Sequence, residues 1–165
     1  LIIKGIKKKK NNNNKQYLYL DDNTWNHINF SELNKLFPNP CLIHIYRDPR
    51  DVICSLLKQR WSPRNLKDCV IFYKKLMAQW TYEKKQLNKK SYLEISFEKL
   101  VMNKEYEFDK ISKFIKFKLN INYNLIDINK SNIGIWRNEF DKSQIKFLNV
   151  ELKDYLKMYN YKITQ

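Results

Sequence analysis

The chain has 165 residues, of which 43% are hydrophobic and 15% aromatic, so its composition is that of a globular domain rather than of a disordered protein. Its formal net charge of +15 suggests a nucleic-acid partner, but only five of its 32 basic residues are arginines, which nucleic-acid sites prefer, and the lysines are spread along the whole chain. We therefore expect no nucleic-acid partner, and a basic nucleic-acid-binding module stays as an alternative.

The chain begins with a segment of low complexity. Residues 1–16 are mostly Lys and Asn, which predicts a disordered segment followed by a domain over 17–165. Within that domain, Ser31 or Asn29 can cap a short first helix. Because the first residue is Leu1 rather than Met, we expect the chain to be part of a longer reading frame.

A strand followed by a sharp turn into a helix comes next. The apolar run 41–46 is short enough for a buried strand, Asp48 is a good N-cap, and Pro49 is a good first helical residue. Arg47 ends the strand, and Ser55 lies eight residues on, in the second helical turn. These two side chains can converge on one anion, which the free N–H groups and the positive end of the helix would help to hold.

Hydrophobic periodicity defines the remaining elements. Apolar residues recur at three- and four-residue steps over four segments, which predicts helices over 49–60, 65–88, 104–117 and 142–158. A second strand is predicted over 92–95, and irregular chain over 119–135. Strands separated by long helices indicate an α/β fold with a parallel sheet flanked by helices. The strands are too few for a complete sheet of this kind, so we expect the N-terminal part of the fold to be incomplete.

The ten residues from Tyr46 to Ser55 are Tyr-Arg-Asp-Pro-Arg-Asp-Val-Ile-Cys-Ser. This segment resembles the 3′-phosphate-binding segment of the sulfotransferases that use 3′-phosphoadenosine-5′-phosphosulfate (PAPS) as sulfuryl donor. The resemblance covers residues 17–161 and implies a P-loop-like sulfotransferase fold. It also implies that Arg47 and Ser55 bind the 3′-phosphate of PAPS. Arg50 is expected either to face solvent or to line the rim of the donor pocket.

Two further blocks carry the same resemblance. In Tyr92–Leu100, Phe97 takes the place of an aromatic residue that lies against the adenine in the family, and a core aromatic is the alternative interpretation. In the block Lys130–Phe140, a Gly, a Trp and a Phe fall in register with the family's C-terminal segment. There Lys130 aligns with a basic residue that reaches the 3′-phosphate, and Ser131 replaces a glycine whose backbone meets that phosphate.

The resemblance also suggests a catalytic base. Sulfotransferases often use a histidine or a carboxylate, placed before the phosphate-binding arginine, to remove the proton of the acceptor. His27 lies twenty residues before Arg47 and is our candidate, with Asp21 and Asp22 as alternatives. His44 lies inside the predicted strand and is interpreted as a core residue.

Cysteine usage bears on the compartment. Cys41, Cys54 and Cys69 are widely spaced and form no C-x-x-C pair, which is typical of free thiols in a reducing compartment and argues against a zinc site. No apolar run approaches membrane-spanning length. We therefore expect a cytoplasmic protein, or one of the Golgi type if an anchor precedes these residues.

The sequence thus predicts a sulfotransferase. It would transfer a sulfuryl group from PAPS to a hydroxyl or amine of a small-molecule, glycan or protein acceptor, without a metal. Sulfotransferases bind the 5′-phosphosulfate with a glycine-containing strand–loop–helix, but this chain contains only Gly5 and Gly134, so that loop is absent from its residues. The alternative is therefore a catalytically degenerate relative that binds 3′,5′-ADP.

Overall fold

The computed structural model describes residues 2–7, 17–21, 29–36 and 40–163. The chain divides into two compact units, each built from two separate stretches of sequence. The first unit comprises Leu1–Tyr46 and Ala78–Ile126, and the second comprises Arg47–Met77 and Asp127–Gln165.

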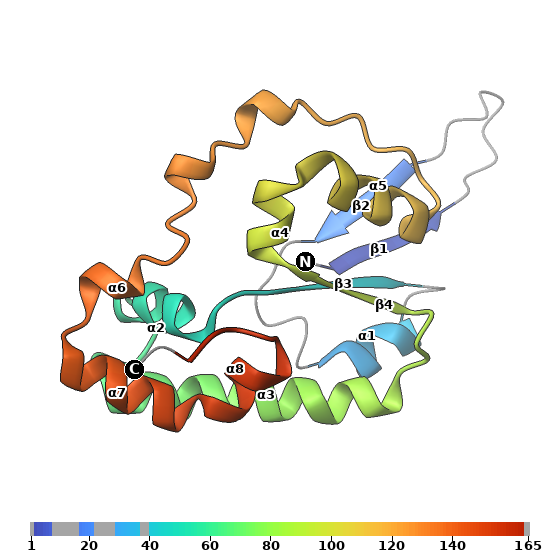
Figure 1. Ribbon diagram of the computed structural model, residues 1–165. Helices are drawn as coiled ribbons and strands as arrows, with labels where there is room; N and C mark the ends of the chain where they lie inside the picture. The colour runs from blue at the N-terminus through green and yellow to red at the C-terminus, as the bar shows by residue number, and fades with distance from the viewer. Residues whose placement is uncertain (1, 8–16, 22–28, 37–39, 164–165) are drawn as a thin grey trace, which may run out of the picture. The chain divides into compact units, whose positions relative to one another are not determined.

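The first unit contains a sheet with the strand order β2-β1-β3-β4 among the described residues. Its strands are β1 (Ile2–Lys7), β2 (Tyr17–Asp21), β3 (Cys41–Tyr46) and β4 (Tyr92–Ser96). Strands β3 and β4 run parallel, in a register that pairs Leu42 with Tyr92 and Tyr46 with Ser96, and they lie side by side in Figure 1. The predicted parallel sheet of an α/β fold is therefore confirmed for these two strands.

Strand β1 corrects the prediction for the start of the chain. Residues 1–16 were expected to be disordered, yet Ile2–Lys7 pairs antiparallel with both β2 and β3. The overall Lys and Asn content conceals three isoleucines in this stretch, and β-branched residues favour strands. Residues 8–16 lie outside the described residues.

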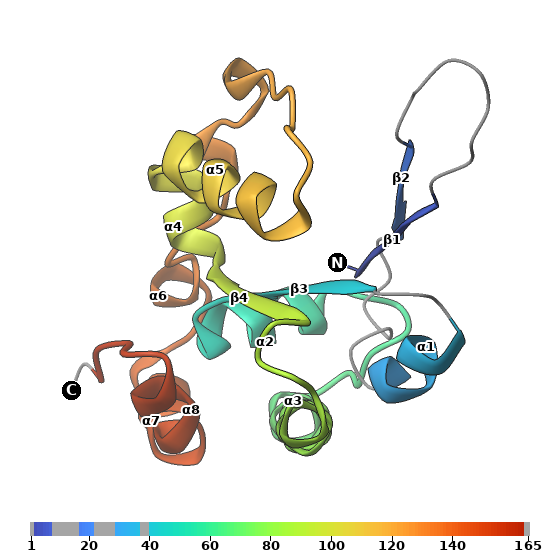
Figure 2. The ribbon, with the colours of Figure 1, turned by 90° about the vertical axis from the view of Figure 1, so that its right-hand side faces the viewer.

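Helices cover both faces of the β3–β4 pair. Successive side chains of a strand point to opposite faces, so each face presents side chains that can pack against a helix. On one face, Ile43 and Ile95 form a buried cluster with Ile111 and Ile115 of α5 (Lys104–Ile115). Figure 2 shows α4 (Phe97–Met102) and α5 on this side, and α1 (Phe30–Leu36) with the end of α3 (Leu66–Gln86) on the other. The predicted helices 65–88 and 104–117 correspond to α3 and α5.

The second unit is helical in its described residues. It contains α2 (Pro49–Leu57), the first part of α3, α6 (Trp136–Glu139), α7 (Lys142–Glu151) and α8 (Lys153–Met158). These helices share a buried apolar core made of Ile53, Leu56, Cys69, Val70, Tyr73, Met77, Trp136, Phe140, Leu148, Leu152 and Leu156. Tyr73 of α3 meets Tyr155 of α8 edge to face, with ring centroids 5.5 Å apart.

The C-terminal helix differs in one respect from its prediction. The sequence indicates one helix over 142–158, but α7 and α8 are separated at Leu152, whose φ of −103° and ψ of 8° leave the α-helical region. Leu148, Leu152 and Leu156 stay buried through this break. The apolar stripe therefore continues across it, and periodicity alone does not reveal the break. Between α5 and α6, the described chain forms only the short turns η2 (Tyr123–Leu125) and η3 (Ile128–Lys130), in agreement with the predicted irregular segment.

Candidate anion-binding site

The start of α2 has the local structure that its sequence predicts. Asp48 caps the helix, because its side chain accepts a hydrogen bond from the backbone N–H of Arg50 at 2.9 Å, and Pro49 occupies the first turn. The chain therefore turns from β3 into α2 within two residues. Arg47 lies at this turn, immediately before the helix.

Arg47 is held by two contacts on one nitrogen of its guanidinium. Its Nη2 donates to the backbone carbonyl of Asn132 and lies 3.3 Å from Oδ2 of Asp51, one helical turn further on. The Arg47 side chain retains 19% of its exposure. One end of the guanidinium is therefore fixed by the protein, although the side chain still reaches the surface.

Asp51 also joins α2 to the segment Asn132–Trp136. Its carboxylate accepts hydrogen bonds from the backbone N–H of Gly134 at 2.7 Å and of Trp136 at 3.1 Å, and its side chain is fully buried. Gly134 has a φ of +76°, a left-handed conformation that a residue with a Cβ adopts only with strain. The glycine that the sequence singled out is thus required by the turn that presents its N–H to Asp51.

The other residues predicted to bind the 3′-phosphate also belong to this unit. Ser55 is exposed on α2, four residues after Asp51, so these two residues share one face of the helix, and Arg47, just before the helix, contacts Asp51. Lys130 ends η3 and is exposed, and the Ser131 hydroxyl donates to the carbonyl of Ile128 at 2.5 Å. The contact between Arg47 and Asn132 brings the first predicted block next to the third.

Arg50 is placed differently from its prediction. It is only 1% exposed, and its guanidinium donates to both carboxylate oxygens of Asp48, to Oδ1 of Asn149 and to the carbonyl of Lys162. It also lies 3.8 Å from the centre of a ring of Trp136. The expectation of a solvent-facing or pocket-rim residue is therefore wrong, because partners about 100 residues away enclose this side chain.

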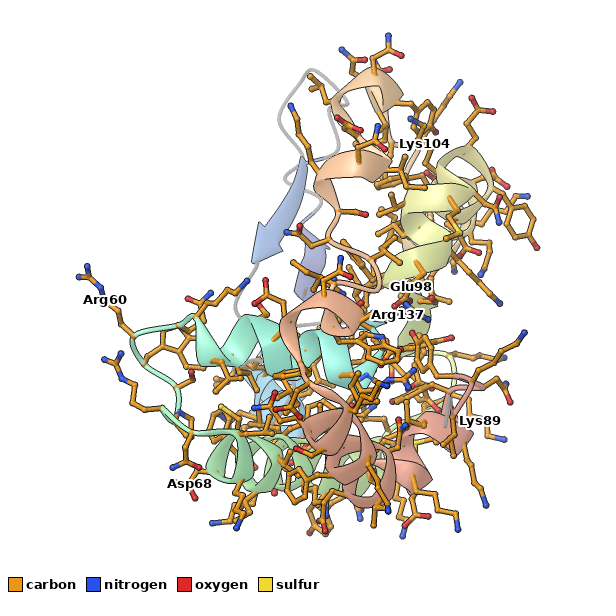
Figure 3. The ribbon with its side chains drawn as sticks, turned by 60° about the vertical axis from the view of Figure 1, so that its left-hand side comes forward. Arg60, Asp68, Lys89, Glu98, Lys104 and Arg137 are labelled. Carbon is orange, nitrogen blue, oxygen red and sulfur yellow. The ribbon has the colours of Figure 1, made fainter. Side chains whose placement is uncertain are left out.

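Arg137 contributes a second cation next to Trp136. Its guanidinium lies 4.4 Å from the centre of a ring of Trp136, and its side chain is exposed at α6 (Figure 3). Arg60, by contrast, lies in the loop after α2 and points outward in the same view. The sequence did not single out the pairing of Arg137 with Trp136, although their adjacency made a cation–π contact available.

In the first unit, Phe97 is the first residue of α4, directly after β4, and its side chain is half-buried. Ser96 caps this helix by accepting a hydrogen bond from the N–H of Lys99 at 3.4 Å. His27 and Asp22 lie outside the described residues, as does the side chain of Asp21. His44 packs against Trp80 with ring centroids 4.4 Å apart, as expected of a core residue.

The chain also matches a known protein family over most of its length. The model of the family described as "Sulfotransferase family" matches residues 5–120, which is more than half of the chain. The chain belongs to the sulfotransferase family. The resemblance inferred from the sequence is thereby confirmed at the level of the family. No protein among the curated sequences matches the chain.

The matched part of this sulfotransferase-family chain includes Arg47, Ser55 and Phe97 but ends before Lys130. The likeness of the third block therefore depends on its own residues and on their contacts with α2. Among the described residues, no helix is both long and apolar enough to cross a membrane, and no three His, Cys, Asp or Glu side chains gather as a metal-binding group.

The groups at the start of α2 suit a phosphate monoester. A partly exposed guanidinium and an exposed hydroxyl on the helix that follows it are groups that proteins use to bind phosphate. The fixed Nη2 limits the rotation of the Arg47 guanidinium plane. In this member of the sulfotransferase family, the second unit therefore presents groups of the kind that can bind an anion.

Proposed function

We propose that this protein transfers a sulfuryl group from PAPS to a hydroxyl or amine of a small-molecule, glycan or protein acceptor. Membership of the sulfotransferase family supports the reaction class. The observation that carries the choice of donor is the anchoring of Arg47, at the start of α2, by Asp51 and by the carbonyl of Asn132. The three free cysteines support a cytoplasmic location.

In this proposal the second unit holds the donor's 3′-phosphate. Arg47 forms charge-assisted hydrogen bonds with it, Ser55 donates its hydroxyl, and Lys130 supplies a further positive charge. The backbone of Ser131 contacts the phosphate. The family resemblance assigns Phe97 the aromatic face for the adenine.

The transfer step is a displacement at sulfur. The acceptor oxygen or nitrogen forms a bond to sulfur while the bond between sulfur and the 5′-phosphate oxygen breaks, and that oxygen leaves with the electron pair as part of 3′,5′-ADP. His27 is our candidate for the base that takes the acceptor's proton. The reaction needs no metal, because positioning and hydrogen bonds to the sulfuryl oxygens can supply the catalysis.

Calorimetric titration with 3′,5′-ADP and with 5′-AMP tests the donor site. We expect the wild-type protein to bind 3′,5′-ADP more tightly, and Arg47→Ala to lower that affinity roughly 10- to 100-fold, the effect of losing a charge-assisted hydrogen bond. Arg60→Ala, which removes an exposed arginine after α2, is the matched control and should bind like wild type. Equal binding of the two nucleotides by wild type, or an equal loss in both variants, would overturn the proposal.

A second candidate is a 3′,5′-ADP-binding relative without transfer activity. Within these residues neither glycine lies in a loop of the kind that binds a 5′-phosphosulfate, since Gly5 lies within strand β1 and Gly134 in the turn bound by Asp51. Incubation with ³⁵S-labelled PAPS and a panel of hydroxyl and amine acceptors separates the two candidates. Labelled product identifies a sulfotransferase, whereas nucleotide binding without any product identifies the binding protein.

A further inference from the structure

We propose that Asp51 is a positioning residue, which sets Arg47 and the Gly134–Trp136 turn for recognition of the donor's 3′-phosphate. This inference rests on the proposed function and extends it, because Asp51 itself would not touch the nucleotide. It acts through the groups that it holds.

The contacts of Asp51 are divided between two parts of the second unit. Oδ2 accepts from the N–H of Gly134 and faces Nη2 of Arg47, while Oδ1 accepts from the N–H of Trp136. Gly134 and Trp136 follow Asp51 by 83 and 85 residues. One fully buried carboxylate therefore joins the arginine before α2 to a turn supplied by a distant part of the chain.

Charge explains why this position needs a carboxylate. A buried carboxylate is costly unless hydrogen bonds and an opposite charge compensate it, and the two N–H groups and Arg47 provide that compensation. The arrangement also limits rotation of the guanidinium plane, and an oriented plane favours two-pronged recognition of a phosphate. Phosphate affinity should therefore depend on Asp51, although its own charge is of the same sign as the phosphate.

Asp51→Asn replaces one carboxylate oxygen by an NH₂ group of nearly the same size. An amide has only one acceptor oxygen, so its NH₂ group must face an N–H donor of the turn or the Arg47 guanidinium. We expect the turn to detach and the Arg47 guanidinium to lose its orientation. Selectivity for the 3′-phosphate should then fall, while the remaining contacts with the nucleotide persist.

The same helix start supplies a matched control. Asp48 is also a buried carboxylate, but its partners are the backbone N–H and the guanidinium of Arg50. Asp48→Asn therefore removes a similar charge without touching Arg47 or Gly134. Loss of stability is expected in both Asn variants, so stability alone does not distinguish a positioning role from a structural one.

The test measures two properties of each nucleotide complex. Calorimetry gives the ratio of affinities for 3′,5′-ADP and 5′-AMP, and ³¹P NMR of bound 3′,5′-ADP reports separately on its two phosphates. For Asp51→Asn we expect the affinity ratio to fall roughly tenfold and the shift of the 3′-phosphate signal to be lost, with the 5′-phosphate signal unchanged. Asp48→Asn should keep the wild-type ratio and both shifts at a temperature below its melting midpoint.

Two further variants keep the inference falsifiable. If Asp51→Asn does not fold, Asp51→Glu serves as the test, because it retains the negative charge. Its longer side chain should displace Arg47 and so also lower the ratio of affinities for 3′,5′-ADP and 5′-AMP. In a double-mutant cycle with Arg47→Ala, the two losses should not add, since Asp51 acts through Arg47. A wild-type ratio in a folded Asp51 variant, or additive losses, would overturn the inference alone. A wild-type protein that does not distinguish the two nucleotides would overturn the proposed function together with it.

Discussion

Arg47 and Arg50 stand three residues apart at the start of α2 and have different surroundings. The side chain of Arg47 keeps 19% of its exposure, whereas that of Arg50 keeps 2%. Arg50 donates to Asp48 and Asn149 and to the carbonyl of Lys162. Of the two arginines, Arg47 is therefore suited to a ligand, and Arg50 stabilises the second unit.

Replacement of Arg50 by methionine should destabilise the protein strongly. The variant leaves the carboxylate of Asp48 buried without its cation, and breaking a buried pair from one side costs about 3–5 kcal/mol. Urea unfolding measures the change in the free energy of unfolding. Arg60→Met, at an exposed position, should stay within about 0.5 kcal/mol of wild type. Similar losses in the two variants would show that the buried network contributes little.

At this scale, local rules predicted the cap formed by Asp48 and the place of Pro49, because a helix start depends on neighbouring residues. The burial of Arg50 and the contact of Asp51 with the Gly134–Trp136 turn were missed. Apart from Asp48 and Arg47, which are close in sequence, the partners of these two residues lie between 83 and 112 residues away, and no local pattern identifies such distant partners. The one sequence signal for the turn was Gly134, because the chain has only two glycines.

Most elements were predicted, including the short helix α1 and the short strands β3 and β4, but two short helices were not. Strands β3 and β4 and helices α2, α3 and α5 agree with the sequence patterns to within a few residues at their ends. The short helices α4 and α6 were missed, because six and four residues carry too little periodicity. Strand β1 was missed because it depends on its neighbours in the sheet as well as on its own isoleucines.

The β3–β4 pair carries a polar cluster on one face. His44 and Glu94 are opposite each other in the parallel register, and α3 adds Trp80 and Lys84. Burial, the largest influence, lowers the pKa of His44 from 6.5, against the hydrogen bond with Glu94 that raises it. Burial also acts to raise the pKa of Glu94, but the hydrogen bonds and charges of His44 and Lys84 outweigh it and lower that pKa to about 2. At neutral pH, Lys84 is therefore the cation of the cluster, and neutral His44 donates through Nδ1.

This cluster predicts loss of stability in acid. Both groups have lower pKa values in the folded protein than their ordinary values of 6.5 and 4.5, so the unfolded chain binds protons first. The contribution of His44 should be complete above pH 6.5 and fall below it. That of Glu94, about 2 kcal/mol after allowance for its partial exposure, should fall between pH 4.5 and 2.

Urea unfolding at a series of pH values measures both contributions. His44→Gln should remove the dependence just below pH 6.5, and Glu94→Gln should reduce the dependence below pH 4.5. Profiles that coincide with wild type in both variants would assign the acid sensitivity to other groups. Tyr92, which contacts Trp80 edge to face, offers Tyr92→Phe as a control that changes no charge in this pH range.

For the whole molecule, the sequence indicated the family but not the division of the fold. The segment from Tyr46 to Ser55 pointed to sulfotransferases, and the family match agrees. The two units each combine separate stretches of the chain, and α3 passes from one to the other. Composition and periodicity describe consecutive residues, so they cannot show which distant stretches share a core.

The net charge of +15 should make stability depend on salt. Like charges repel one another in the compact state, and salt weakens this repulsion beyond a Debye length of about 10 Å at 0.1 M. We expect the thermal midpoint to rise by about 3 °C between 20 and 200 mM NaCl, which corresponds to roughly 1 kcal/mol. A constant or falling midpoint would show that attractive ion pairs outweigh the repulsion. The same titration on a variant with several exposed lysines changed to glutamine should give a smaller rise.

The sequence separation between Arg50 and its partners also bears on when the second unit can fold during synthesis. Its partner Asn149 follows it by 99 residues and the carbonyl of Lys162 by 112, so the ribosome delivers them long after α2 has emerged. At typical rates of translation this delay is about 5–20 s. During that time Arg50 lacks its distant partners and α2 lacks the part of its core that residues 127–162 supply, and the nascent chain exposes these groups to chaperones. The first unit is complete once residue 126 has emerged, so the unit with the proposed donor site should be the last to fold.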